Sequence, residues 1–91
     1  MDNRVAVISI IVEREDAIEE LNNLLHEARQ YIIGRMGIPY RLKGISIISI
    51  AIDAPQDKIS ALSGKIGRLK GVSAKTAYSN VITPAEGGAG D

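Results

Sequence analysis

Two segments of this 91-residue chain consist almost entirely of β-branched and other aliphatic residues, and they limit the fold more than any other feature. These segments are residues 4–13 (RVAVISIIVE) and residues 45–53 (ISIISIAID). A strand with one face in water alternates apolar and polar residues, whereas near-continuous apolar runs are typical of strands covered on both faces. We therefore expect both segments to be central strands of a sheet.

Two other segments have the apolar spacing of amphipathic helices. The first opens at Glu15 and Asp16, whose charges suit the positive end of a helix. Its apolar residues recur three or four positions apart, at Ile18, Leu21, Leu24, Leu25 and Ala28. The second follows Ala54 and Pro55, and we expect Gly71 to cap it. Its apolar stripe is Ile59, Leu62, Ile66 and Leu69.

The remaining apolar segments predict edge strands. Residues 31–40 (YIIGRMGIPY) are interrupted by glycine and contain Pro39, which cannot donate a hydrogen bond to a neighbouring strand. Residues 41–44 suit a hairpin turn, and residues 72–81 alternate in the manner of an edge strand. The order β-α-β-β-α-β predicts an α+β, ACT-like ferredoxin sandwich. Its antiparallel sheet has strand order 4-1-3-2, with two helices on one face.

The domain is expected to span residues 1–83. Residues 84–91 (PAEGGAGD) contain too few apolar side chains to fold, and we predict a disordered tail there. On the second helix, Ser60, Ser63, Gly64 and Gly67 gather on the side away from the apolar stripe. Two interpretations remain open for this side, a close backbone approach by a neighbour or a neutral helix face.

The second face of the sheet gives the main indication of how the chain acts. Two helices cover only one face, yet both central runs are aliphatic on both sides. A bare patch on the order of several hundred Å² is rare on monomers, and a symmetric self-contact is the commonest cover. We predict a homo-oligomer, dimer or tetramer, with a merely apolar surface as the alternative. The candidate interface residues are Val5, Val7, Ile11, Ile45 and Ile47.

The sequence contains no recognisable catalytic or metal-binding set. Cysteine is absent, which removes disulfides, thiolate metal sites and cysteine nucleophiles. The one histidine, His26, has no second histidine at a ligand spacing, and a surface imidazole is its simplest interpretation. Its contribution to a metal site shared between subunits stays open. We predict that the chain is not an enzyme and holds no metal or cofactor.

Charge and hydropathy exclude other classes of partner. Eleven basic residues balance eleven acidic ones, so no net field attracts nucleic acid or an anionic membrane. The apolar runs are broken within about ten residues, far short of a membrane span. The N-terminus is too polar for a signal peptide. We expect a cytoplasmic protein that binds neither nucleic acid nor membrane directly.

Residues 34–41 (GRMGIPYR) stand out for their chemistry. Gly34 and Gly37 permit close approach of a partner, and Tyr40 offers a flat ring with a hydroxyl group. Arg35 and Arg41 carry guanidinium groups that can bind an anion in bidentate fashion. These five residues are the candidates for ligand or partner contact, and a bulged edge strand with protective charges is the alternative.

Four blocks through nearly all of residues 4–80 resemble the family of iron-only hydrogenase system regulators: VAVISIIVE, YIIGRMGIPYR, KGISIISIAID and KISALSGKIGRLKGVSAKTAYS. This resemblance implies a ferredoxin-like fold akin to ACT domains and to the C-terminal domain of the nickel-responsive repressor. It also implies a regulatory role, through effector sensing or assembly, in an iron-only hydrogenase system.

Within that resemblance, some features of the wider relatives are missing. ACT-like domains bind small effectors at subunit interfaces near the turn between first strand and first helix, but residues 13–16 lack the glycine common there. The histidines and cysteine of the nickel repressor's metal site are absent, and we expect no DNA-binding domain. Two functions remain open. One is a stand-alone regulatory oligomer that binds a small anionic effector through Arg35, Tyr40 and Arg41. The other is an interaction module for a hydrogenase-related protein, without a small ligand.

Overall fold

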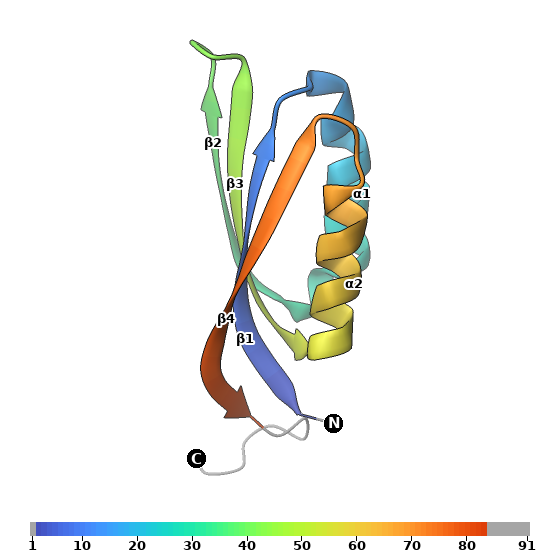
Figure 1. Cartoon of the computed structure of the whole chain (residues 1–91), viewed down its shortest axis with the longest axis vertical. Coiled ribbons are helices and arrows are strands. Elements are labelled where there is room, and N and C mark those ends of the chain that lie inside the picture. Colours follow the sequence, from blue (N-terminus) through green and yellow to red (C-terminus); the bar gives the residue numbers. More distant parts are fainter. Residues whose placement is uncertain (1, 84–91) are drawn as a thin grey trace.

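The computed structural model of the protein describes residues 2–83, which form one four-stranded sheet with both helices on the same side (Figure 1). The strands are β1 (Asn3–Val12), β2 (Ile32–Tyr40), β3 (Ile45–Pro55) and β4 (Val72–Thr83). The helices are α1 (Ile18–Glu27) and α2 (Gln56–Gly67), with short 3-10 turns η1 (Glu15–Ala17) and η2 (Arg29–Tyr31) at the two ends of α1. All pairings are antiparallel and the order is β2-β3-β1-β4. The predicted ferredoxin-like sandwich is confirmed.

The two long aliphatic runs occupy the centre of the sheet, as predicted. β1 pairs with β3 along its whole length, with Ile8 opposite Ile50 and Ile10 opposite Ile48. The core lies between this pair and the helices, and its fully buried large side chains are Ile8, Ile10, Leu21, Ile50, Ile52, Ile59 and Ile66. Burying each such side chain contributes about 1.5–3 kcal/mol relative to leaving it in water. The apolar stripes of both helices therefore face the sheet.

Several element boundaries differ from the sequence-based expectation. β3 runs two residues further than predicted, because Ala54 and Pro55 still pair with Arg4 and Asn3. The acidic opening of the first helix is a 3-10 turn, and the α-helix begins at Ile18. The predicted tail, residues 84–91, lies outside the described residues.

The small residues of α2 do not mark a close backbone approach within the chain. Its two serines face β4, where Thr76 Oγ1 donates a hydrogen bond to Ser63 Oγ at 3.0 Å. A Cβ added at Gly67 would meet nothing within 4 Å, and one at Gly64 would meet only the Arg68 guanidinium, at 3.4 Å. Within the part of the chain described, these glycines lie on a neutral helix face.

Gly71 was expected to cap α2, but it acts further along the chain. The helix ends at Gly67, and Gly71 turns the backbone into β4 with a φ of 77°. Its carbonyl oxygen accepts a hydrogen bond of 2.7 Å from the Glu13 amide, which ties this turn to the end of β1. A Cβ here would collide with the side chain of Arg14.

The two glycines give a matched pair of substitutions. Gly71→Ala is expected to lower the free energy of unfolding by about 1–2 kcal/mol, because the left-handed backbone disfavours a Cβ and Arg14 must move. Gly67→Ala is expected to raise it by about 0.5–1 kcal/mol, since alanine has the higher helix propensity and room is available. Urea unfolding followed by circular dichroism measures both. Equal effects of the two substitutions would contradict the assigned backbone conformations.

Candidate functional site

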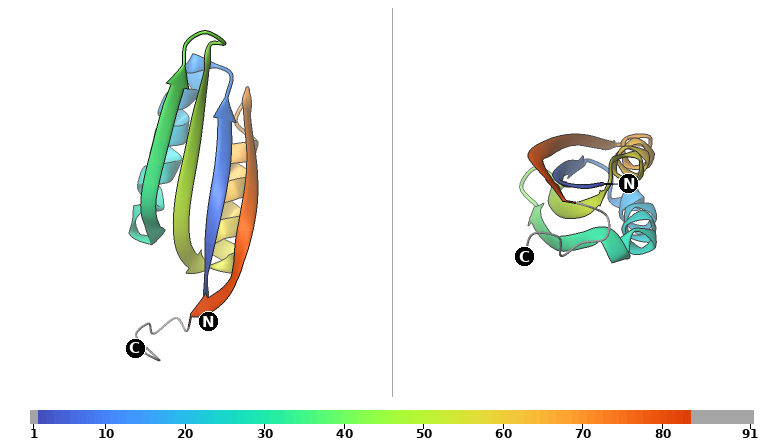
Figure 2. Two further views of the ribbon diagram at one scale, coloured as in Figure 1. Left: turned by 90° about the vertical axis from the view of Figure 1, so that its left-hand side faces the viewer. Right: turned by 90° about the horizontal axis from the view of Figure 1, so that it is seen from below.

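The sheet face opposite the helices is open to solvent (Figures 1 and 2). Side chains alternate along a strand, so the residues on either side of a buried position, such as Ile47 and Ser49 beside the buried Ile48, point to this open side. The exposed fractions there are 38% for Val7, 41% for Ile11 and 40% for Ile47. The register places Ile11 directly opposite Ile47, which is in turn opposite Ile38. An apolar row therefore crosses three strands.

We call this surface the helix-free apolar face. Its apolar members are Val5, Val7, Ile11, Met36, Ile38, Tyr40, Ile45 and Ile47. All five residues predicted for the interface belong to it. Sequence reasoning missed the two β2 residues Met36 and Ile38, because glycines interrupt that segment. Their spacing of two residues was the available signal, and Tyr40 continues it.

The five residues predicted to contact a ligand do not surround one hollow. Arg35 and Gly37 lie opposite the buried Ile50 and Ile48, and so belong to the helix side of β2. Tyr40 points to the helix-free apolar face. Arg41 lies in the hairpin turn after β2, and Gly34 lies beside Ala51 just past a β-bulge. The joint binding of one anion by these residues stays a prediction.

Arg35 helps to line a hollow of about 330 Å³ at the C-terminal end of α1, here called the Arg35 hollow. Its Nη2 donates a hydrogen bond of 2.9 Å to Asn22 Oδ1. Arg29 also lines it and donates from Nη1 to the His26 carbonyl oxygen, again at 2.9 Å. The lining residues are Asn22, Leu25, His26, Arg29, Ile32 and Arg35, and none of them is acidic.

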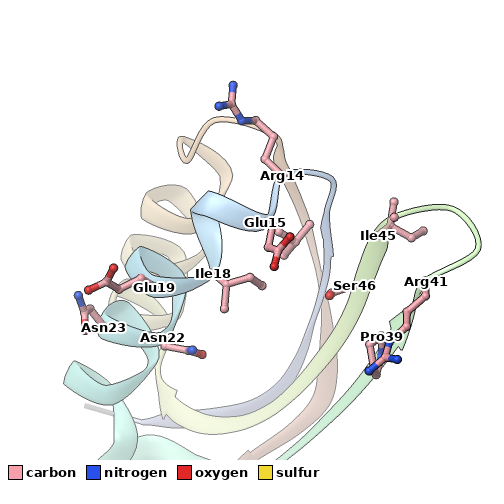
Figure 3. A pocket seen from close by; sticks show the side chains of 12 residues that line it. Arg14, Glu15, Ile18, Glu19, Asn22, Asn23, Pro39, Arg41, Ile45 and Ser46 are labelled. Atoms are coloured by element: carbon pink, nitrogen blue, oxygen red, sulfur yellow. The ribbon is translucent and has the colours of Figure 1, made fainter.

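A larger cleft of about 860 Å³ separates α1 from the β2–β3 hairpin, and Figure 3 shows it from close by. We call it the hairpin cleft. Ile18 and Asn22 point into it from the helix, and Glu15 and Glu19 also line that side. Pro39, Arg41, Ile45 and Ser46 line the hairpin side. The cleft thus has an acidic helix wall and a basic residue on the opposite wall.

Arg14 borders the cleft but points away from it (Figure 3). It forms a bidentate pair with Asp16, with Nη2 2.7 Å from Oδ2 and Nε 3.1 Å from Oδ1. The hydrogen bonds from Arg14 hold the pKa of the Asp16 carboxyl below its usual range, and they raise the pKa of Arg14. Arg14 is therefore engaged locally and leaves Arg41 as the basic residue directed at the cleft.

Within residues 2–83 no three His, Asp or Glu side chains gather in a way that could hold a metal ion. Neither helix in this range is long and apolar enough to cross a membrane. The cytoplasmic location stays a prediction.

The fold is a ferredoxin-like sandwich, and comparison with known proteins shows the family of the chain. Residues 4–76 match the TM1266-like family, described as iron-only hydrogenase system regulators, and the chain belongs to this family. Among solved structures, it is similar to protein TM1266 from Thermotoga maritima, with 38% identity and a TM-score of 0.81. That likeness covers 84% of this chain and 96% of the Thermotoga chain.

A second solved structure shares the fold alone. A formyltetrahydrofolate deformylase from Pseudomonas putida has 13% identity and a TM-score of 0.62, over 85% of this chain and 29% of the deformylase. No curated protein sequence matches the chain. The resemblance found in the sequence is thus confirmed at the level of family and fold.

The Arg14–Asp16 pair gives a test of the geometry beside the cleft. In a carbon-detected NMR titration, the Asp16 carboxyl should ionise at a pH below its ordinary value of 3.8, and Arg14→Ala should raise that midpoint. Because the folded-state pKa is lowered, the pair adds stability at neutral pH and loses it as the pH falls through that pKa. Both side chains are exposed, so added salt should weaken the effect. A midpoint unchanged by Arg14→Ala would contradict the pairing.

Proposed function

We propose that this chain is a regulatory module of an iron-only hydrogenase system that works as a homo-oligomer, with its subunits packed through the helix-free apolar face. The observation that carries the proposal is the row formed by Ile11, Ile38 and Ile47, three large aliphatic side chains left 40–51% exposed across β1, β2 and β3. Monomeric proteins rarely leave a contiguous patch of this kind in water.

The size of the face suits a stable self-contact. The apolar face covers three strands spaced about 4.8 Å apart, with about ten residues rising about 3.3 Å each, and so spans roughly 14 by 33 Å. Such a face has a flat area on the order of 500 Å², and its accessible area is larger because side chains protrude. A standard interface takes about 800 Å² from each partner. The face therefore supplies most of the area that a specific dimer needs.

One end of the face also carries a polar group without a partner in the chain. Asp53 alternates with the buried Ile52 and Ala54, so it lies on the helix-free side next to Val5. Its Oδ1 atom is buried and accepts no hydrogen bond. Buried carboxylate oxygens are nearly always paired, and a donor from a second subunit would reach this one only after neighbouring side chains moved.

A different protein could cover the same face instead, which would make the chain an interaction module. The two functions differ in the state of the purified chain. A self-associating module has a mass that is a multiple of 9.7 kDa, whereas a module awaiting another protein is a 9.7 kDa monomer. The aliphatic character of the face, without a dominant charge, favours self-association.

The double substitution Ile11→Thr/Ile47→Thr tests the proposal, because threonine keeps the β-branched shape and adds a polar hydroxyl to the centre of the face. We expect the dissociation constant of the oligomer to rise at least about tenfold, equivalent to about 1.4 kcal/mol. Sedimentation velocity over a concentration series measures this constant.

Ile33→Thr is the matched control, since Ile33 is 63% exposed in the β-bulge and outside the apolar row. It should leave the constant unchanged. A wild-type monomer, or equal weakening by the control, would rule out assembly through this face. In cells that depend on the chain, the double variant should reproduce the hydrogenase phenotype of a deletion, and the control should behave as wild type.

Effector binding is a second candidate, and the Arg35 hollow is the observation that favours it. Arg29, Arg35 and His26 gather around one hollow that has no acidic lining residue. Guanidinium groups bind carboxylate and phosphate oxygens with two parallel hydrogen bonds. A single hydrogen bond from Arg35 Nη2 to Asn22 Oδ1 holds this guanidinium beside the hollow. A small anionic effector is the ligand class that this chemistry suits.

Thermal shift measurements with inorganic phosphate, sulfate and small dicarboxylates test this site. A ligand at a hundred times its dissociation constant adds about 2.7 kcal/mol, which raises the melting midpoint by roughly 10 °C in a domain of this size. Arg35→Ala should abolish the shift. Arg41→Ala should preserve it, because Arg41 lines the hairpin cleft instead. A flat screen, or loss of binding in the Arg41 variant alone, would contradict an anion site in the Arg35 hollow.

A further inference from the structure

We propose that the tip of the β2–β3 hairpin of one copy docks into the hairpin cleft of a second copy. This contact lies on a different surface from the helix-free apolar face. It is a second self-interface, so it goes beyond the function proposed above and can fail separately from it.

The tip consists of Arg41, Leu42, Lys43 and Gly44, and it reaches past the end of the helical layer (Figures 1 and 2). Two backbone hydrogen bonds hold the turn, from the Lys43 amide to the Tyr40 carbonyl at 3.2 Å and from the Gly44 amide to the Arg41 carbonyl at 3.1 Å. Leu42 is 81% exposed at its end. The turn therefore presents a leucine and a lysine on an ordered support.

The cleft beside the tip has the complementary surface. Its apolar lining comes from Val12, Ile18 and Ile45, and its helix wall carries Glu15 and Glu19. Arg14–Asp16 is the only ion pair among residues 2–83. Glu15 and Glu19 therefore form no ion pair with Arg41 or Lys43 of the same chain. The two walls stand apart around about 860 Å³ of open space (Figure 3).

A second copy of the tip fits this space by charge and by polarity. Leu42 of the entering tip would contact the apolar lining, and Lys43 would meet Glu15 and Glu19 on the helix wall. An isolated exposed leucine is common on protein surfaces. Here Leu42 adjoins Lys43, and this apolar and cationic pair matches the apolar lining and the acidic helix wall of the hairpin cleft.

The position of the tip also permits a closed assembly. The tip and the cleft are neighbours on each chain, so a twofold axis near them places each tip in the other chain's cleft. Such an isologous contact forms every interaction twice and leaves no open end. Combined with a twofold contact through the helix-free apolar face, it gives a tetramer with three perpendicular twofold axes. Either contact alone gives a dimer.

A charge exchange on the full chain tests the docking, with the mass read by light scattering after size exclusion. We expect a wild-type mass of four times 9.7 kDa. Leu42→Ser should halve it, and Glu15→Lys/Glu19→Lys should do the same by placing like charges beside Lys43. Adding Lys43→Glu to the Glu15→Lys/Glu19→Lys variant should restore the tetramer. Such a rescue would show that the double variant is folded and that its charge alone prevents docking. Glu20→Lys/Glu27→Lys, on α1 but outside the cleft lining, is the control with the same charge change and should remain tetrameric.

The outcomes separate this inference from the proposed function. If Leu42→Ser has the wild-type mass, or the charge exchange fails to restore assembly, the hairpin contact is wrong. That conclusion leaves the sheet contact intact, provided that Ile11→Thr/Ile47→Thr still dissociates the wild-type assembly. The reverse pattern, a mass that responds to Leu42 and not to the isoleucines, supports the hairpin contact and overturns the sheet contact. If Leu42→Ser has the wild-type mass and a zwitterionic amino acid stabilises the chain, the hairpin contact is wrong and the cleft is assigned to a small ligand.

Discussion

The antiparallel pairing of β1 with β3 is the interaction on which the rest of the structure depends. It joins ten consecutive positions, from Asn3 opposite Pro55 to Val12 opposite Ser46. On the helix side, Ile8, Ile10 and Ile50 are fully buried. Removing this pair would leave both helices without a surface on which to bury their apolar stripes. The edge strands β2 and β4 each depend on one of these two central strands for their hydrogen bonds.

The same pairing creates the surfaces that a regulator can use. The helices cover one side of the sheet and leave the other uncovered (Figure 2). Because the central strands are aliphatic on both sides, the uncovered side is apolar. β2 is covered least, with every residue from 33 to 40 exposed. These surfaces offer shape, apolar area and charge. Those properties suit assembly and recognition, which agrees with a family described as regulators.

The two hollows beside α1 differ in charge although they share one wall. Asn22 lines both of them, and its hydrogen bond to Arg35 spans the space between helix and strand. On one side of this bond the lining is basic, with Arg29 and His26. On the other side, Glu15 and Glu19 line the helix wall of the cleft, and Arg41 lines the hairpin wall. The Asn22–Arg35 hydrogen bond thus lies beside two hollows, one lined by basic residues and one lined by residues of both charges.

The sequence by itself determined the strands and the helices, because apolar periodicity is a local property of each segment. It also determined which strands are central, because only those two segments are apolar on both faces. It also determined that Arg35 and Tyr40 lie on opposite faces of β2, since an odd spacing on a strand changes sides. Only the tertiary structure decided which face each takes, through the register with β3 and the bulge between Ile32 and Gly34. It likewise decided that Arg35 meets Asn22 while Arg41 borders a separate cleft. Those contacts join residues far apart in the chain, and their positions depend on how α1 packs across the sheet, which no local pattern encodes.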